Sequence, residues 1–193
     1  GEDFDGDIDY IEFGNILQMN ESFSVGGWVK NEGSNSSTIM SKRSHENNGT
    51  TYYGWQLSYE NDGQMGIYIQ EDNSGGAIAK ATTDQIFNEL FHIMAVFDAG
   101  NTINLYINGI LVDSNPTALS YLSNNNADFL ISSLQDAGSW IWDGSLDELF
   151  IYDKALTQID VFEIFTSSPN TDDNNLKGYW KFNAGEGDIL YDH

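Results

Sequence analysis

Short runs in which hydrophobic and polar residues alternate, separated by turn sequences, cover most of the chain. Thr102–Ile107 and Ile110–Ser114 flank Asn108-Gly109, a pair typical of a two-residue type I′ hairpin turn. A second hairpin is predicted around Asp62-Gly63, which lies between two further alternating runs. Phe91–Asp98 is apolar at almost every position, which indicates a strand buried on both faces.

One short helix is predicted near the C-terminus, at Gln158–Thr166. Thr157 is a good N-cap, and Asp160 stands where the acidic residue of a capping box would stand. Leu156 can pack as a staple against Val161. The apolar residues that fall together on one side of this helix are Ile159, Phe162 and Phe165. Because the helix is short, we expect it to lie across the end of the molecule rather than form a layer.

Many short strands with turns between them, and no alternation of strands with helices, predict an all-β fold. The expected architecture is a two-sheet antiparallel β-sandwich, or jelly roll, with one short helix near the C-terminus. A chain of 193 residues can bury a full core without cross-links, and this chain has no cysteine. Its two prolines leave the strands largely uninterrupted.

The charge balance narrows the possible partners. Seven Lys and Arg residues face 30 Asp and Glu residues, which gives a formal net charge of −23. Nucleic acids and anionic membranes both require a basic surface, so neither is an expected partner. No apolar run approaches the roughly 20 residues of a membrane span, so we expect no membrane insertion. Solubility alone accounts for most of the acids, but such a surface also suits divalent cations.

Two acidic phrases near opposite ends of the chain share one pattern. Phe4–Asp9 reads FDGDID and Trp142–Asp147 reads WDGSLD. Each has an aromatic residue, Asp, Gly, any residue, Ile or Leu, and Asp. We expect the two phrases to lie side by side and to present carboxylates to a calcium ion, which prefers oxygen ligands. The alternative is that Asp5 and Asp143 are turn residues that simply precede glycine.

Five segments together resemble the laminin-G-like, concanavalin A-like jelly-roll superfamily, in the form found in bacterial multidomain surface proteins. They are FDGDIDYIEF at Phe4–Phe13, FSVGGWVK at Phe23–Lys30, IMSKR at Ile39–Arg43, NLYINGILV at Asn104–Val112, and DGSLDELFIYDKALTQIDVFEIF at Asp143–Phe165. The resemblance implies a structural calcium ion held by Asp5 and Asp147, with Asp9 and Asp143 as second choices. It also implies a secreted or cell-surface, extracellular location.

The resemblance places a laminin-G-like domain at residues 1–175. Leu176–His193 resembles the opening strands of the same family, which normally precede the FDG motif rather than follow the helix. This segment therefore either completes the sandwich or begins the next copy of a tandem array. We expect it to pack on the same sandwich, because an exposed apolar edge invites aggregation.

An enzymatic function is not expected. Laminarinase-type hydrolases of this fold use E-x-D-x-E or E-x-D-x-x-E on one strand, and a retaining pair stands about 5 Å apart. No such string occurs here, and the strand pattern puts Asp147 and Glu148 on opposite faces. His92 lies within the apolar run at Phe91–Asp98 and is interpreted as a core residue.

Glycan-binding modules stack sugar rings on exposed aromatic side chains and bind hydroxyl groups with polar ones. The loop at Arg43–Tyr53 and the loop before Asp143 both carry such residues. The candidate ligand-binding residues are Arg43, His45, Tyr52, Tyr53, Gln135 and Trp140. The resemblance assigns Trp28, Trp55 and Trp142 to the core, which leaves Trp140 as the expected exposed tryptophan.

Two functional classes remain open. The first is a non-catalytic, calcium-stabilised extracellular module that recognises glycans. The second is a structural or adhesive repeat of a tandem extracellular array that binds no sugar. The expected partners are a glycan or a cell-surface or extracellular protein, together with neighbouring domains of the same polypeptide. Aromatic loops favour the first class, whereas the acidic excess and the repeat-like tail favour the second.

Overall fold

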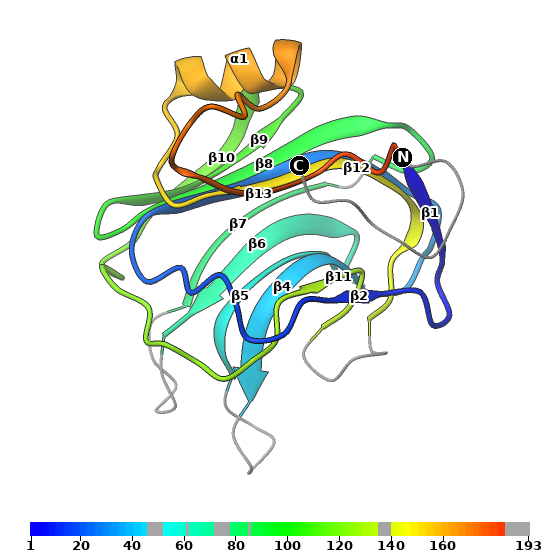
Figure 1. The fold of residues 1–193 in the computed structure, drawn as a ribbon, viewed down its shortest axis with the longest axis horizontal. Coiled ribbons are helices and arrows are strands. Elements are labelled where there is room, and N and C mark those ends of the chain that lie inside the picture. The colour runs from blue at the N-terminus through cyan, green and yellow to red at the C-terminus, as the bar shows by residue number, and fades with distance from the viewer. Residues whose placement is uncertain (46–51, 61, 72–77, 85, 135–139, 184–193) are drawn as a thin grey trace.

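The computed structural model describes residues 1–45, 52–60, 62–71, 78–84, 86–134 and 140–183. In these ranges the strands form two antiparallel sheets that pack face to face (Figure 1). The seven-stranded sheet has the order β1 (Glu2–Asp5), β12 (Asp143–Tyr152), β3 (Phe23–Asn31), β8 (Phe91–Asp98), β9 (Thr102–Ile107) and β10 (Ile110–Pro116), with β13 (Leu176–Trp180) also paired to β12. The six-stranded sheet has the order β2 (Ile11–Glu12), β11 (Leu130–Ile131), β4 (Ser37–His45), β5 (Tyr52–Tyr59), β6 (Gln64–Gln70) and β7 (Ile78–Asp84).

This architecture confirms the predicted all-β sandwich and both predicted hairpins. β9 and β10 pair across Asn108 and Gly109, whose φ angles of 50° and 75° are those a type I′ turn requires. β5 and β6 pair on either side of Asp62-Gly63. β8 is buried along almost its whole length, as its apolar sequence predicts.

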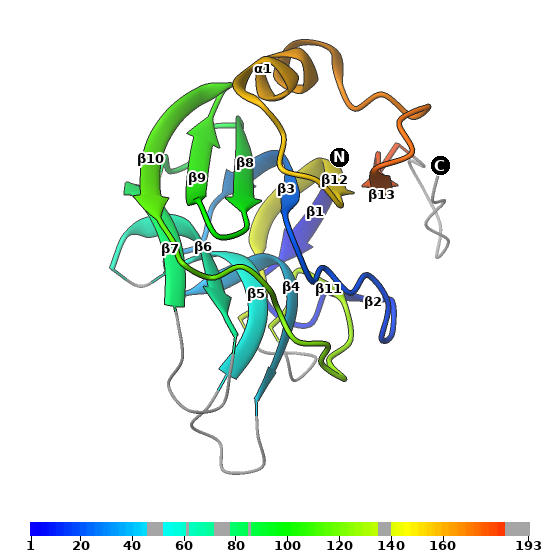
Figure 2. The ribbon, with the colours of Figure 1, turned by 90° about the vertical axis from the view of Figure 1, so that its left-hand side faces the viewer.

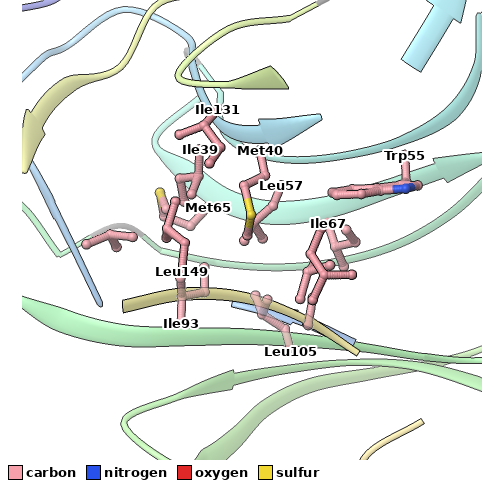
Figure 3. Packing of buried hydrophobic residues seen from close by; sticks show 14 of the residues in the cluster. Ile39, Met40, Trp55, Leu57, Met65, Ile67, Ile93, Leu105, Ile131 and Leu149 are labelled. Carbon is pink, nitrogen blue, oxygen red and sulfur yellow. The ribbon is translucent and has the colours of Figure 1, made fainter. Parts of the chain in front are cut away.

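The main core fills the space between the two sheets. Alternate residues of β5 and β6 point into it, and they meet inward residues of β8, β9 and β12. Figure 3 shows Trp55, Leu57 and Ile67 on one side of this layer, with Ile93 and Leu149 on the other. Because strand side chains alternate, burying these residues directs their neighbours to the opposite faces of the sheets.

A second, smaller core lies between the seven-stranded sheet and α1 (Gln158–Ser167). Figure 2 shows α1 above β8, β9 and β10, on the side away from the six-stranded sheet. Val161 and Ile164 of the helix pack with outward residues of the sheet, including Met94 and Phe150. The expectation that the helix lies across the end is therefore wrong, because these outward residues are apolar and require a cover.

The start of α1 confirms the predicted capping box. The Thr157 hydroxyl accepts a hydrogen bond from the Asp160 backbone N–H at 3.3 Å, and the Asp160 carboxylate accepts from the Thr157 N–H at 2.8 Å. Only part of the predicted apolar side of the helix is in contact with the sheet. Phe165 contacts Trp28, whereas Ile159 and Phe162 are 71% and 56% exposed.

β12 pairs with two terminal strands along the same edge. Its first half pairs with β1, and its second half, from Leu149 to Tyr152, pairs with β13. The segment beginning at Leu176 thus packs on this sandwich up to Trp180, and residues 184–193 lie outside the described ranges. That this segment also resembles the start of a further repeat stays a prediction.

His92 is a core residue beneath α1, as the sequence predicts. Its side chain is 2% exposed and lies between the rings of Trp28, Phe150 and Phe165, at centroid distances of 5.4, 5.9 and 5.8 Å. Within the described part of the chain, its Nδ1 atom has no hydrogen-bond partner. Burial lowers the pKa of His92 from 6.5 to about 4.

The substitution His92→Phe should make the domain less sensitive to acid. Between pH 6.5 and about 4 the unfolded chain protonates His92 while the folded chain does not, so folding stability falls as the pH falls. The full effect is roughly 3 kcal/mol, from 1.36 kcal/mol per pKa unit. Urea unfolding of both proteins at pH 7 and pH 4 measures it, since the other groups contribute equally to both. Equal losses of stability in the two proteins would contradict this role of His92.

Candidate functional site

The two acidic phrases lie side by side, because β1 runs antiparallel to the first half of β12. Phe4 lies opposite Gly144, and Asp5 lies opposite Asp143. Directly opposite residues of an antiparallel pair project to the same face, with Cβ atoms about 4.5–5.5 Å apart. The register therefore brings together the carboxylates of Asp5 and Asp143.

Asp147 and Asp9 are not part of this pair. Asp147 lies four residues further along β12 than Asp143, which is roughly 13 Å at the usual strand rise. Its carboxylate is 3.3 Å from the amino group of Gly1. Asp9 is exposed beyond the end of β1, and its carbonyl accepts a hydrogen bond from Ser132. The expected combination of Asp5 with Asp147 is thus not brought together. The pairing of β1 with β12 sets Asp5 opposite Asp143, which holds the equivalent position in the other phrase.

Two glycines make room for the Asp143 carboxylate. A Cβ atom at Gly6 would lie 2.9 Å from the Asp143 Cβ, and one at Gly33 would lie 2.8 Å from Asp143 Oδ2. The Asp143 carbonyl accepts hydrogen bonds from the backbone N–H groups of Glu32 and Gly33. Among the residues that the structure describes, three or more His, Asp or Glu side chains nowhere converge on a metal-sized site. An ion here would need backbone and water oxygens besides the two carboxylates.

A second polar area covers the outer face of the six-stranded sheet, which is curved with its hollow side turned away from the other sheet (Figure 1). Trp55, Leu57 and Tyr59 of β5 point into the core. Gln56 and Ser58 therefore point outward. Ser41 and Tyr68 lie directly opposite Gln56 on the flanking strands and share its face. We call the group formed by Ser41, Arg43, Gln56, Ser58, Glu60 and Tyr68 the polar face.

Hydrogen bonds join four residues of the polar face into one network: Arg43, Gln56, Ser58 and Glu60. The Arg43 guanidinium donates to Gln56 Oε1, and Gln56 Nε2 donates to the Ser58 hydroxyl at 3.0 Å. Glu60 Oε1 accepts from Ser58 Oγ at 3.2 Å and from Gln56 Nε2 at 3.3 Å. Gln56 is 1% exposed and Ser58 is fully buried. A buried network of this kind holds its polar groups in fixed positions.

The environment of the polar face controls its ionisation. Burial raises the pKa of Glu60, Asp62 raises it further, and hydrogen bonds from Ser58 and Gln56 and the charge of Arg43 oppose the shift. Burial raises the pKa of Tyr68 far above its usual value, and the negative charges of Glu60 and Asp62 add to this effect. Tyr68 is therefore a neutral hydroxyl at any physiological pH.

The predicted ligand-binding residues do not all lie on the polar face. Arg43 lies on the polar face, whereas Tyr53 lies opposite Ser44, one position out of phase with Arg43, and so belongs to the other face. His45 and Tyr52 pair with each other at the ends of β4 and β5. The side chains of His45 and Tyr52, and the whole of Gln135, lie outside what the structure describes.

The backbone of Trp140 lies beside β4. Its side chain is 37% exposed, and its carbonyl accepts a hydrogen bond from the N–H of Thr38, which lies opposite Ser58. Trp55 and Trp142 are buried, in agreement with their assignment to the core. Trp140 is thus an exposed tryptophan at the edge of β4, and its contact with a ligand stays a prediction.

Sequence reasoning missed five residues of the polar face: Ser41, Gln56, Ser58, Glu60 and Tyr68. A usable signal was present in GWQLSYE at Gly54–Glu60, where aromatic and apolar residues alternate with polar ones. Combined with the predicted hairpin at Asp62-Gly63, this alternation indicated a polar outer surface. It could not show that Glu60, beyond the end of β5, folds back onto that surface.

Comparison with known proteins gives a family. A laminin G-like family model, described as the concanavalin A-like lectin/glucanases superfamily, matches residues 5–162. Adhesion G-protein coupled receptor V1 of Danio rerio is 24% identical over 177 residues, which are 89% of this chain and 3% of the receptor. The chain thus spans a small part of that relative. No helix among the described residues is both long and apolar enough to cross a membrane.

Solved structures with the same fold come from several kinds of protein. A Bacteroides ovatus protein described as a candidate carbohydrate binding protein has a TM-score of 0.74 and 16% identity, covering 98% of this chain and 54% of its own. A heptameric SAP-like pentraxin of Limulus polyphemus has a TM-score of 0.62 and 17% identity, covering 87% and 83%. The binding domain of botulinum neurotoxin DC, in complex with SialylT, has a TM-score of 0.59 and 17% identity, covering 78% and 36%. At these identities the likeness concerns the fold, and together with the family match it shows that this chain belongs to the concanavalin A-like lectin/glucanases superfamily.

Proposed function

We propose that this chain is a non-catalytic module that binds glycans through the polar face of its six-stranded sheet. The observation that carries the proposal is a hydrogen-bonded network on the side of the sheet that faces away from the core, in which buried Gln56 and Ser58 hold the partly exposed side chains of Arg43 and Glu60. Polar groups that are held in place before binding lose little entropy when a ligand arrives.

The chemistry of the polar face suits sugar hydroxyls, which both donate and accept hydrogen bonds. Glu60 offers carboxylate acceptors, and Tyr68 offers a neutral hydroxyl that can do either. Trp140 at the edge of β4 provides an exposed ring on which a pyranose can stack. These contacts combine an apolar platform with a few fixed polar groups, as small-ligand sites commonly do.

The comparisons with known proteins support glycan binding as the class of function. The Bacteroides ovatus protein is described as a candidate carbohydrate binding protein, and the neurotoxin binding domain was solved with SialylT. The similarity to an adhesion receptor supports a secreted or cell-surface setting, with an extracellular protein as the alternative partner. That similarity also favours the second candidate function, an adhesive repeat that contacts neighbouring domains and binds no sugar.

We further propose that a calcium ion stabilises the edge where β1 meets β12, with Asp5 and Asp143 as its carboxylate ligands. Their opposed positions, and the close approach of the Gly6 and Gly33 backbones to Asp143, support this assignment. The ion would supply charge compensation for two like charges on one face. Its role would be to hold the N-terminal strand on the sandwich, a contribution to folding rather than to catalysis.

Glycan binding should depend on Trp140 and Arg43. Trp140→Ala removes the stacking surface and should weaken binding roughly tenfold, the upper end of what one aromatic contact contributes. Arg43→Ala frees Gln56 and should weaken binding further. A glycan array followed by calorimetry on the best ligand measures both effects. Phe162→Ala is the control, because Phe162 is an exposed aromatic residue on α1, which covers the other sheet.

Two results would count against the proposal. If the Phe162→Ala control weakens binding as much as Trp140→Ala does, the glycan binds elsewhere. Absence of binding to any glycan, with a folded wild-type protein, would favour the adhesive repeat instead.

Chelation of calcium should lower the melting temperature of the wild-type domain by several degrees. At free calcium 100 times the Kd, a bound ion contributes about 2.7 kcal/mol, which corresponds to about 5–10 °C for a chain of this size. Asp143→Asn should abolish the response, because it removes one of the two carboxylates. Asp147→Asn, on the same strand but away from the pair, should preserve it. Scanning calorimetry with calcium and with EGTA tests both variants, and a wild-type protein that shows no shift would refute the site.

A further inference from the structure

The Glu60 carboxylate has a fixed position on the polar face. Glu60 follows the last residue of β5, and its Oε1 atom accepts hydrogen bonds from two outward residues of that strand, Gln56 and Ser58. Its backbone is held as well, since the Glu60 N–H donates to the Gln64 carbonyl at 2.9 Å and the Gly63 N–H donates to the Glu60 carbonyl at 3.0 Å. The carboxylate therefore remains over the network and does not swing freely into solvent.

Few positive charges are available to balance this carboxylate. Arg43 acts on Glu60 electrostatically, and Lys80 lies opposite Tyr68 in the register of β6 and β7. Asp62 also acts on Glu60, with a charge of the same sign as that of the carboxylate. The other basic side chains are engaged elsewhere: Lys30 with Glu32, Lys154 with Asp173, Lys177 with Asp153, Lys42 with Asn15 and the Ala127 carbonyl, and Lys181 over Tyr179.

We propose that the polar face selects neutral, hydroxyl-rich glycans and rejects acidic ones, and that Glu60 is the residue that sets this preference. This inference rests on the proposed function of the polar face. A carboxylate only accepts hydrogen bonds, so it pairs with sugar hydroxyls, and such charge-assisted O–H···O⁻ bonds are short and strong. A uronate or sulfate group brings acceptors alone and a like charge, which Glu60 cannot pair with and repels.

The net charge of the whole chain also disfavours the binding of acidic glycans, and it acts at longer range than Glu60. Its net charge of −23 opposes the approach of any polyanion, but salt screens this effect beyond about 8 Å at physiological ionic strength. A repulsive contact within the site persists at higher salt, because no solvent lies between the charges. Rejection of the wrong ligand by an unpaired like charge is a common source of specificity.

The test uses matched pairs of polysaccharides that share one backbone and differ in uronate or sulfate groups. The wild-type protein should bind the neutral member of a pair at least roughly tenfold more tightly than its acidic counterpart. This ratio of affinities should hold at both 0.15 M and 0.5 M salt. Glu60→Gln keeps an acceptor oxygen and removes the charge, so it should reduce this ratio to roughly threefold or less. Glu163→Gln makes the same substitution at an exposed position on α1 and should leave the ratio unchanged.

The outcomes separate the inference from the proposed function. Wild-type binding of acidic chains as tight as that of neutral chains would overturn the inference and leave glycan binding in place. A ratio that Glu60→Gln leaves unchanged, or that Glu163→Gln reduces equally, would overturn the role of Glu60. A wild-type protein that binds neither member of any pair would overturn the proposed function itself.

Discussion

The packing of β5 against the opposite sheet determines most of what this molecule presents to its surroundings. Trp55, Leu57 and Tyr59 are buried in the main core. Because successive side chains of a strand point to opposite faces, this burial places Gln56 and Ser58 on the outer face. A slip of one residue would turn the polar residues into the apolar core and the aromatic ones away from it, so the core fixes the register of β5. The polar face is in this sense a consequence of the core beneath it.

β12 connects the two ends of the chain to the middle of the fold. It pairs with β3 on one side, and on the other side with β1 and then β13. Between these two partners the pairing with β3 shifts its register, and Glu148 has a φ of 50°. This bulge marks the place where the edge passes from the N-terminal strand to the C-terminal one. Contacts between residues so distant in sequence link the edges of the sheet to its centre.

The two faces of the seven-stranded sheet have different roles. Its inner face completes the main core, and its outer face carries the smaller core under α1, where His92 is enclosed by three aromatic rings. This side of the molecule is closed by apolar packing. The outer face of the six-stranded sheet is closed by hydrogen bonds between polar side chains instead. The proposed glycan-binding surface therefore lies on the six-stranded sheet, whereas the outer face of the seven-stranded sheet is covered by α1.

The amino-acid sequence determined the fold class, both hairpins, the doubly buried strand and the capped helix, because each depends on residues that are neighbours in the chain. It also identified the two acidic phrases and their proximity. It could not determine that Asp5 faces Asp143 rather than Asp147, since register between strands 138 residues apart is fixed by the whole sheet. Likewise the placement of Glu60 over Gln56 and Ser58 depends on how the chain turns after β5. Local pattern selects the elements, whereas long-range packing decides which side chains meet, because only the folded chain brings distant residues within contact distance.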